Sequence, residues 1–216
     1  MYLRVITPPV AIVTAAEAKA WAPVLANDDD ARVDALLAAA QAQIEPPNSY
    51  LGRAFGQQTL ELVLDGWYPS YPPCSPTRIT LPAPPLIEVT GIVYVDADGA
   101  EQTLATTVYR VAGVGGRGMV ILNDGQSWPT LRDNDPEAVR ISFKAGYDLD
   151  DPQLLPAKQA VVLIATGLRG LSLQEANLRS ETVEGIGSTS FDVSGAARGE
   201  VSGYVDGLLA SYRVFG

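Results

Sequence analysis

The sequence predicts an α+β protein with a helical core, formed by its N- and C-terminal helices, and a small antiparallel β domain inserted between them. The prediction rests on hydrophobic periodicity, which is helical at first, changes to a period of two from about residue 57, and returns to helical after about residue 155. We expect one compact chain with an N-terminal helical part over 1–56, an inserted β domain over 57–147, and C-terminal helices over 148–216.

Two helices are expected in the N-terminal part. Thr14 and Glu17 have the spacing of a capping box, in which each side chain accepts a hydrogen bond from the backbone amide of the other residue. A second helix is expected within residues 27–45, because acidic residues lie near its N-terminus and apolar residues share one face. These apolar residues are Val33, Leu36, Leu37, Ala40 and Ile44. Pro46 and Pro47 end the helix, since proline lacks the amide donor of an interior helical position.

Short alternating runs separated by turn residues predict the strands of the β domain. In order they are QTLELVLDGW, TRITLP, LIEVTGIVYVDADGAEQTL, VYRVAG, GMVILND and AVRISFKAGY. Asp98 and Gly99 form a dipeptide that is favoured in tight hairpins. The surrounding residues resemble the start of a calcium loop, but the twelfth position from Asp96 is Thr107, where such a loop needs a bidentate carboxylate. We therefore favour the hairpin.

Two glycine-rich stretches have the composition of phosphate-binding loops but not their context. A phosphate loop follows a buried strand and runs directly into a helix, whose amides and dipole hold the anion. Residues 183–195, VEGIGSTSFDVSG, follow a polar segment, contain no lysine and continue in an alternating pattern. Residues 111–122, VAGVGGRGMVIL, precede a strand instead of following one, so we interpret their glycines as a hairpin loop.

The C-terminal part returns to helical periodicity. Pro156 suits the first turn of a helix, and the residues after it are apolar nearly all round, which predicts a buried helix. Another helix is expected near the end of the chain, although Gly203 and Gly207 each cost it about 1 kcal/mol relative to alanine. It therefore needs tertiary contacts, and the candidate residues are Leu208, Leu209, Tyr212 and Arg213.

The composition argues against several classes of function. The chain has no histidine, which removes the most frequent general base, zinc ligand and member of hydrolytic triads. The single Cys74 has no partner for an internal disulfide, and a formal charge of −10 repels nucleic acid and anionic lipid. The longest apolar run is too short for a membrane span. We expect a soluble, cytoplasmic protein without metal or cofactor.

Two groups of residues leave alternatives open. Asp148, Asp150 and Asp151 would be metal ligands or catalytic carboxylates if the fold brought another acid opposite them, and we favour a solvated loop that caps the following helix. The aromatic residues of two proline-rich loops form either a sugar-binding or protein-docking surface or a cover over the ends of the β domain. The sequence supports both interpretations equally, and the residues are Trp67, Tyr68, Tyr71 and Trp128.

Several short segments, none of them a chemical motif, follow one another in an informative order. They are ITPP, TAAEAKAW, YLGRAFGQQTLELVLDGW, ITLPAPPLIEVTGIVYVDADGAEQTL, YRV, GQSWPTLR, AVRISFKAGY, LPAKQAVVLIA, VEGIGSTSFDVSG and VDGLLASYRV. Their order, through almost the whole chain, resembles the head-to-tail connector (adaptor, or head completion) proteins of long-tailed bacteriophages and gene transfer agents. The likeness comes from many weak pieces in one order.

This resemblance implies a structural virion protein and no catalysis. It implies an oligomeric ring, twelvefold to match the portal, that forms beneath the portal protein after DNA packaging and completes the head. A stopper or tail-completion protein docks below, DNA is only passing cargo in the lumen, and no membrane is involved. The expected location is the virion head-tail junction, after assembly in the bacterial host cytoplasm. The alternative is a carbohydrate- or cell-surface-binding module that uses the Trp and Tyr loops, and a two-carboxylate glycoside hydrolase is a third class.

Under this resemblance, residues 181–195 become a candidate arm that pairs with a neighbouring chain, because backbone pairing tolerates a glycine-containing, alternating sequence. The residues expected to contact the portal or an adjacent subunit are Glu184, Gly185, Ile186, Gly187, Ser188, Thr189, Ser190 and Phe191. Protein-docking loops are expected at Trp67, Tyr68 and Trp128. The overall acidity suits a channel wall that repels DNA phosphate.

Overall fold

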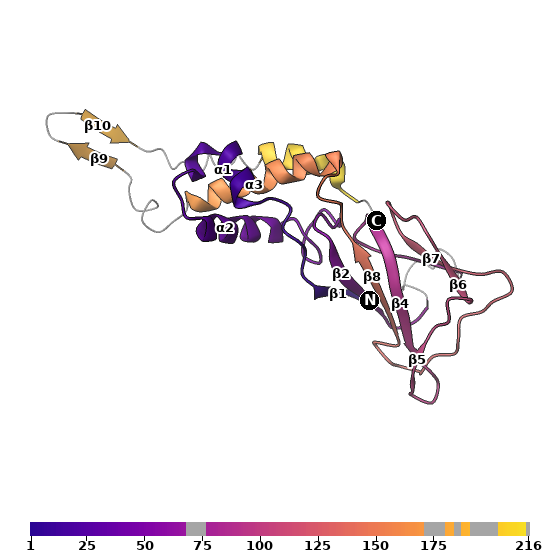
Figure 1. Ribbon diagram of the computed structural model, residues 1–216. Helices are drawn as coiled ribbons and strands as arrows, with labels where there is room; N and C mark the ends of the chain where they lie inside the picture. Colours follow the sequence, from indigo (N-terminus) through magenta and orange to yellow (C-terminus); the bar gives the residue numbers. More distant parts are fainter. Residues whose placement is uncertain (68–76, 171–179, 184–186, 191–202, 215–216) are drawn as a thin grey trace. The chain divides into compact units, whose positions relative to one another are not determined.

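A strand, not a helix, opens the chain in the computed structural model (Figure 1). β1 (Tyr2–Thr7) pairs antiparallel with β2 (Gln58–Leu64), whereas the sequence predicted a helical part over 1–56. The strand escaped prediction because its burial does not alternate as the pattern of a half-buried strand requires. The structure describes residues 1–67, 77–170, 180–183, 187–190 and 203–214, with backbone only at 180–183 and 187–190.

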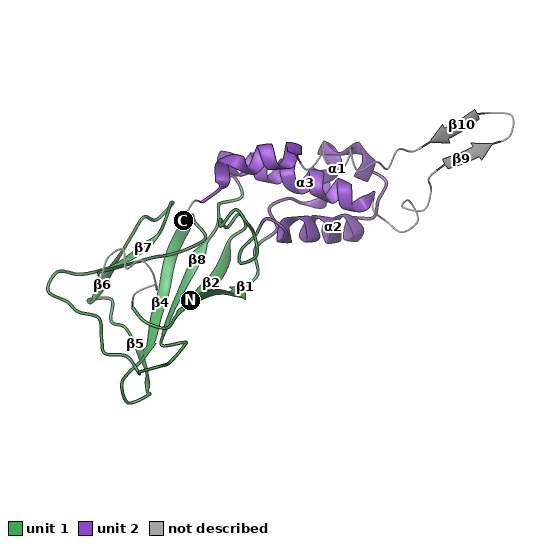
Figure 2. Cartoon of the chain, turned by 180° about the vertical axis from the view of Figure 1, so that it is seen from behind, with its two compact units in different colours: residues 1–10, 45–149, 216 green, residues 11–44, 150–215 purple. Residues whose placement is uncertain are grey.

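The chain divides into two compact units, coloured green and purple in Figure 2. The β unit comprises residues 1–10 and 45–149, and the helical unit comprises residues 11–44 and 150–215. Within the described residues, the chain therefore crosses between the units three times. The first ten residues and residues 45–56 belong to the β unit, which differs from the predicted boundaries, because β1 joins its sheet and Glu45 is bonded inside it.

The β unit contains a five-stranded antiparallel sheet in the order β1-β2-β8-β4-β5 and a three-stranded sheet in the order β3-β7-β6. The strands after β2 are β3 (Arg78–Thr80), β4 (Leu86–Val95), β5 (Glu101–Thr103), β6 (Tyr109–Ala112), β7 (Met119–Leu122) and β8 (Val139–Ala145). Leu60 lies opposite Phe143 in the central pair, and both belong to one buried core with Ile79 and Val120 of the second sheet. The inserted antiparallel β domain is thus confirmed.

Both predicted hairpins form. β4 and β5 are joined through Asp98 and Gly99, whose φ is +86°, and the Asp96 carboxylate accepts hydrogen bonds from backbone amides inside this loop. β6 and β7 are joined through the glycine-rich loop, where Gly113 has a φ of +77°. A Cβ at Gly113 would overlap the carbonyl oxygen of Arg117, so the loop requires glycine there for space as well as for conformation.

The helical unit contains three α-helices, an additional helical stretch over residues 203–209, and three short 3₁₀ turns among its described residues. They are α1 (Ala15–Trp21), η1 (Pro23–Leu25), α2 (Asp30–Ala42), η2 (Pro152–Leu154), α3 (Leu155–Arg169) and η3 (Ala210–Tyr212). α2 and α3 pack against each other. None of the described helices is long and apolar enough to cross a bilayer.

The start of α1 confirms the predicted capping box. The Thr14 hydroxyl accepts from the Glu17 amide at 3.2 Å, and the Glu17 carboxylate accepts from the Thr14 amide at 2.9 Å. α2 buries Val33, Leu37 and Ala40, as its periodicity predicted. Leu36 lies at the border of that face and is half-buried. The face that anchors α2 was therefore readable from the sequence.

Partly buried ion pairs supplement apolar contact in the helical unit. Asp28 pairs with Arg169 of α3 at 2.5 Å and with Arg32 at 3.8 Å, and its side chain is only 9% exposed. The hydrogen bond from Arg169 holds the pKa of Asp28 below its ordinary value. Glu17, already bonded to Thr14, also pairs with Lys158 at 3.5 Å. These contacts connect α3 to the segments around α1 and α2.

A short hairpin forms a separate sheet near the C-terminal end of the sequence (Figure 1). β9 (Ser180–Val183) pairs antiparallel with β10 (Gly187–Ser190), and Val183 lies opposite Gly187. The extended conformation expected for the candidate arm is therefore present at Gly187, Ser188, Thr189 and Ser190. Glu184, Gly185, Ile186 and Phe191 lie outside the described residues.

Candidate interaction surfaces

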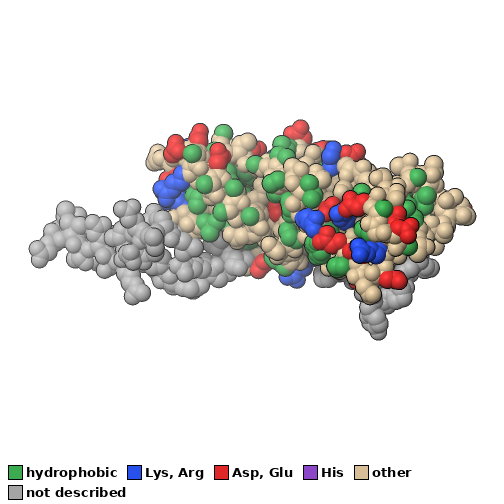
Figure 3. Space-filling model, turned by 90° about the horizontal axis from the view of Figure 1, so that it is seen from below, with side chains coloured by type: hydrophobic (Ala, Val, Ile, Leu, Met, Phe, Trp, Pro, Cys, Tyr) green, Lys and Arg blue, Asp and Glu red, His purple; other side chains and the backbone are tan. Residues whose placement is uncertain are grey.

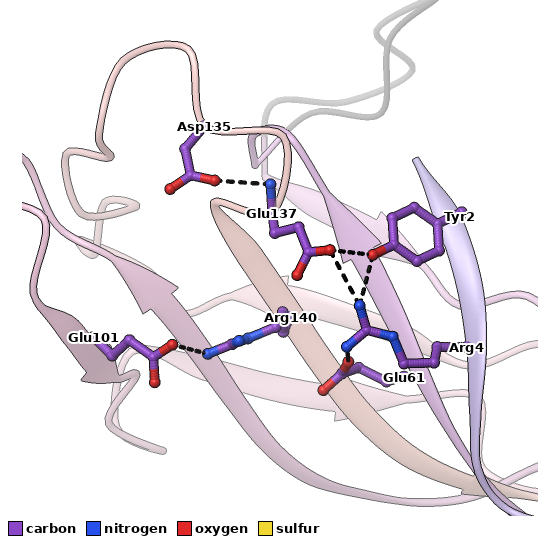
Figure 4. A network of polar contacts seen from close by, with 7 residues as sticks. All are labelled: Tyr2, Arg4, Glu61, Glu101, Asp135, Glu137 and Arg140. Atoms are coloured by element: carbon purple, nitrogen blue, oxygen red, sulfur yellow. Dashed lines mark hydrogen bonds and ion pairs between the residues drawn. The ribbon is translucent and has the colours of Figure 1, made fainter.

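The outer face of the five-stranded sheet carries a network of charged side chains (Figure 4). Arg4 of β1 lies opposite Glu61 of β2 and bonds to its carboxylate at 3.0 Å. The same guanidinium bonds to Glu137 at 3.1 Å and donates to the Tyr2 hydroxyl at 2.7 Å. The Tyr2 hydroxyl in turn donates to Glu137. Alternation along β1 and β2 puts Tyr2, Arg4 and Glu61 on the face opposite the core, and Glu137, two residues before β8, bonds to the same group.

Two further ion pairs extend this network across the sheet. Arg140 of β8 bonds to Glu101 of β5 at 2.5 Å, and Lys144 of β8 bonds to Glu88 of β4 at 2.8 Å. We call the whole set the polar sheet face: Tyr2, Arg4, Glu61, Glu88, Glu101, Glu137, Arg140 and Lys144. Acidic and basic side chains lie beside one another over the β unit in Figure 3. The face presents alternating charges, not a patch of one sign.

Electrostatics at Tyr2 and Glu137 keep both side chains in their ordinary charge states near neutral pH. The hydrogen bond from Tyr2 lowers the pKa of Glu137, and the hydrogen bond to Glu137 raises the pKa of Tyr2. Glu137 therefore stays ionised and Tyr2 stays neutral, and neither is tuned to transfer a proton at pH 7. The network suits recognition by complementary charge better than chemistry.

The structure brings Trp67 and Trp128 together but does not leave both open to a ligand. Their rings are stacked with centroids 4.6 Å apart and an interplanar angle of 10°. Trp67 is 5% exposed, and its indole N–H donates to the Pro129 carbonyl at 2.8 Å. The binding-module interpretation requires both rings on an exposed face, so the burial of Trp67 favours the cover over the β core. Tyr68 and Tyr71 lie outside the described residues.

The acidic run after β8 is used for local hydrogen bonds. The Asp151 carboxylate caps η2 by accepting from the Gln153 amide at 2.8 Å, which confirms a capping role, although for η2 and not directly for α3. Asp148 accepts from the Gln57 side chain at 2.6 Å. Within the described ranges, no group of three or more histidine, cysteine or acidic side chains is arranged to hold a metal ion.

The candidate contacts of the C-terminal helical stretch differ in burial. Leu209 and Tyr212 are buried, and the Tyr212 hydroxyl donates to the carbonyl of Gln153 in the same unit. Leu208 is half-buried, and Arg213 is exposed. Leu209 and Tyr212 therefore provide the tertiary contacts that the glycine-containing helix needs, while Arg213 faces solvent.

Sequence reasoning missed a buried carboxylate at Glu45, which is 3% exposed. It accepts hydrogen bonds from the amides of Phe55 and Gly56, at 3.0 and 2.7 Å, and from the Gln58 side chain at 2.8 Å. No periodicity or spacing marks this residue, because two of its partners are backbone amides of the irregular residues before β2, and backbone groups leave no pattern in the sequence. Its only signal is an acid directly before two prolines.

Residues 55–58 also form hydrogen bonds with the chain beside the first and the third crossing between the units. The Val10 amide donates to the Gln57 carbonyl at 3.0 Å, just before the first crossing. The Tyr147 amide donates to the Phe55 carbonyl at 2.9 Å, and Asp148 accepts from Gln57, just before the third. Glu45 makes such contacts beside the second crossing. The chain next to each of the three crossings is thus hydrogen-bonded to residues 55–58 of the β unit.

These features define a two-unit α+β protein with a charged sheet face. Neither a protein-family model nor a curated protein matches the sequence. Solved structures do. A chain of the structure described as "Virion of native gene transfer agent (GTA) particle" is 22% identical, with a TM-score of 0.66, and the match covers 100% of this chain and 97% of that chain.

Two further structures give the same result. A chain of "Neck of empty GTA particle computed with C6 symmetry" is 22% identical with a TM-score of 0.67, and a chain of "Neck of native GTA particle computed with C12 symmetry" is 19% identical with a TM-score of 0.60. Both matches again cover 100% of this chain and 97% of the other. The likeness establishes that this chain shares its fold with chains of those particles along its full length.

Proposed function

We propose that this chain is a structural adaptor at the head-tail junction of a gene transfer agent or long-tailed phage. In this role it forms a ring beneath the portal, completes the DNA-filled head and provides the docking surface for a stopper or tail-completion protein. The observation that carries the proposal is the fold shared, over the whole chain, with chains of particles whose described parts are a virion and its neck. The order of sequence segments points to the same family.

Ring formation is supported by the symmetry in the names of the related neck structures, C6 and C12. A ring needs two different surfaces on each copy, because head-to-tail contacts close only when one surface fits another. The polar sheet face carries both signs of charge on strands that are fixed by the core, which suits a contact of defined register.

The charge of the chain supports the passage of DNA past the ring without retention. Acidic residues outnumber basic residues by 12 to 8 in the β unit and by 13 to 7 in the helical unit. Phosphate is therefore repelled by the chain as a whole, not by one acidic tail. The proposed partners are the portal, a stopper or tail-completion protein and other copies of this chain, with DNA as cargo.

The test is co-sedimentation of the purified protein with DNA-filled, tailless heads that carry the portal from the same genome. We expect the protein to pellet with these heads and to add a ring of density at the portal vertex in cryo-electron microscopy. Heads assembled without portal are the control and should leave the protein in the supernatant. Protein that stays in the supernatant with portal-bearing heads, at concentrations well above cellular ones, contradicts the proposal.

A further inference from the structure

β1 is the longest open strand edge of the β unit. It has six residues and pairs on one side only, with β2, among the described residues. The other terminal strands of the two sheets, β3, β5 and β6, have three, three and four residues. An open edge presents unpaired backbone N–H and C=O groups to which another strand can bond.

The edge of β1 lacks the usual protection by a free charge. Proteins guard such edges with charged side chains, most often lysine. Arg4 is the charged residue of β1, and its guanidinium is held on the polar sheet face by Glu61 and Glu137. Beside it, Tyr2 and Ile6 expose 44% and 51% of their surface. The edge is therefore accessible near both ends of the strand.

An apolar pocket of about 210 Å³ adjoins the start of β1. Its lining residues are Met1, Tyr2, Leu3, Pro46, Pro47, Gly52, Leu62, Pro82 and Ala83. All of them belong to the β unit. An open edge next to a side-chain pocket is the arrangement used in strand addition, where backbone bonds supply affinity and the pocket supplies specificity.

The same chain carries a strand pair suited to this edge. β9 and β10 form a two-stranded sheet that is joined to neither sheet of the β unit. An isolated two-stranded hairpin is marginal in water and gains stability by joining a larger sheet. Among the described residues, β9 and β10 pair only with each other, and in a ring the β1 edge of the adjacent copy offers them a larger sheet to join.

We propose that the edge of β1 and its adjoining pocket receive the β9–β10 hairpin of a neighbouring copy, which extends the five-stranded sheet across the subunit boundary. The inference rests on the ring of the proposed function, in which each copy donates one hairpin and accepts another. Donor and acceptor are different surfaces, as a closed head-to-tail ring requires.

The test uses the full chain assembled on portal-bearing heads, with Ile6 replaced by the photo-crosslinking residue p-benzoylphenylalanine. Equal amounts of unlabelled and ¹⁵N-labelled protein are mixed before assembly, so that mass spectrometry separates crosslinks between copies from those within one copy. We expect crosslinked peptides that join β1 of one copy to residues 180–190 of another. The same crosslinker at Thr103 of β5, on the opposite edge of the sheet, is the control and should not reach residues 180–190.

The outcomes separate this inference from the proposed function. If the protein binds heads but the Ile6 position crosslinks only to portal, to other segments or to nothing, the hairpin does not occupy β1 and the inference is wrong, while the adaptor role stands. If the wild-type protein does not bind heads at all, the proposed function fails first. Crosslinks within single copies alone also overturn the inference.

A second experiment uses two assembly-defective variants. Ile6→Lys places a charge on the acceptor edge, and deletion of 180–190 removes the donor. Each variant alone should lose ring density on heads, whereas Val24→Lys, a matched change at a residue 54% exposed in the helical unit, should keep it. Full rings from either of the two variants would overturn the inference. Circular dichroism and a thermal midpoint within a few degrees of wild type verify that each variant is folded.

Discussion

Glu45 shows how a single buried carboxylate organises an irregular part of the chain. Its two oxygens accept from two backbone amides and from the side-chain amide of Gln58, the first residue of β2, so residues 55–57 are ordered without belonging to a helix or a strand. Buried amides that lose their acceptor keep their desolvation cost, and this cost exceeds the net value of the hydrogen bond itself. The effect of removing Glu45 therefore exceeds that of an exposed acid.

We expect Glu45→Ala to lower the free energy of unfolding by about 2 to 4 kcal/mol, because two backbone amides lose a buried acceptor. Urea denaturation followed by circular dichroism measures the change. Glu88→Ala, which removes an exposed partner of Lys144, is the control and should cost less than about 1 kcal/mol. Equal effects of the two substitutions would contradict the stabilising role assigned to the buried Glu45 carboxylate.

Asp28 gives the helical unit an acid-sensitive contribution to stability. Its pKa is lowered in the folded chain, mainly by the hydrogen bond from Arg169. The ionised carboxylate therefore stabilises the folded chain relative to the unfolded chain. The contribution is present above the ordinary pKa of 3.8 and is lost as the pH falls through the lower folded value.

Asp28→Asn should therefore lower the thermal midpoint at pH 7, and the difference from wild type should shrink toward pH 3. Differential scanning calorimetry at several pH values measures it. Asp34→Asn, at an exposed position on α2, is the matched control and should change the midpoint little at either pH. A difference that stays constant or grows on acidification would contradict the role of the Arg169 contact.

Among the elements, the β6–β7 hairpin contains two glycines that are required for different reasons. One position needs glycine for its backbone conformation alone, and the other also needs it for space. Gly113 and Gly115 both have a φ of +77°, but a Cβ would overlap Arg117 at Gly113 and would meet open space at Gly115. A left-handed conformation costs an L-residue roughly 1–2 kcal/mol, and a steric overlap with backbone adds to that cost. The two positions thus share the conformational penalty and differ in the overlap.

We expect Gly115→Ala to destabilise the β unit by about 1 kcal/mol and Gly113→Ala by at least about 2 kcal/mol, because only the second adds the overlap. Chemical denaturation of the two variants beside wild type measures the difference. Similar costs at both positions would mean that the loop moves to accommodate the Cβ at Gly113.

The elements that sequence reasoning found are those fixed by local chemistry. The Thr14–Glu17 capping box, the apolar face of α2 and the hairpin turn at Asp98 and Gly99 each depend on residues a few positions apart. β1 and Glu45 were not found, because their partners lie far along the chain or are backbone groups. Likewise, no local pattern reveals that β2 pairs with β8 or that Trp67 is buried under Trp128.

For the molecule as a whole, the charge distribution is the property that bears on DNA. Both units are acidic, and the sequence isoelectric point is about 4.4. A surface of this composition repels phosphate at neutral pH, and salt screens the repulsion at separations beyond the Debye length, about 8 Å at physiological ionic strength. In the proposed ring, this repulsion would keep passing DNA free of long-lived attachments.

We expect acid-to-lysine reversals at lumen-facing positions, once the ring has been imaged, to slow DNA ejection, and the delay should diminish as salt is raised. Ejection is measured by the fluorescence of a dye that binds released DNA. The same number of reversals on the outer wall of the ring is the control. An unchanged ejection rate in the lumen variant would contradict the role assigned to the acidity.

The hydrogen bonds that link the three described chain crossings to residues 55–58 have a mechanical consequence. Under the proposed function, tension between the two units is carried by three covalent connections of the described chain, each hydrogen-bonded to the same short segment of the β unit, and not by a single linker. Each connection carries only part of the force, and the segment resists it by hydrogen bonds that are loaded together. A chain anchored in this way resists separation of its two units under load.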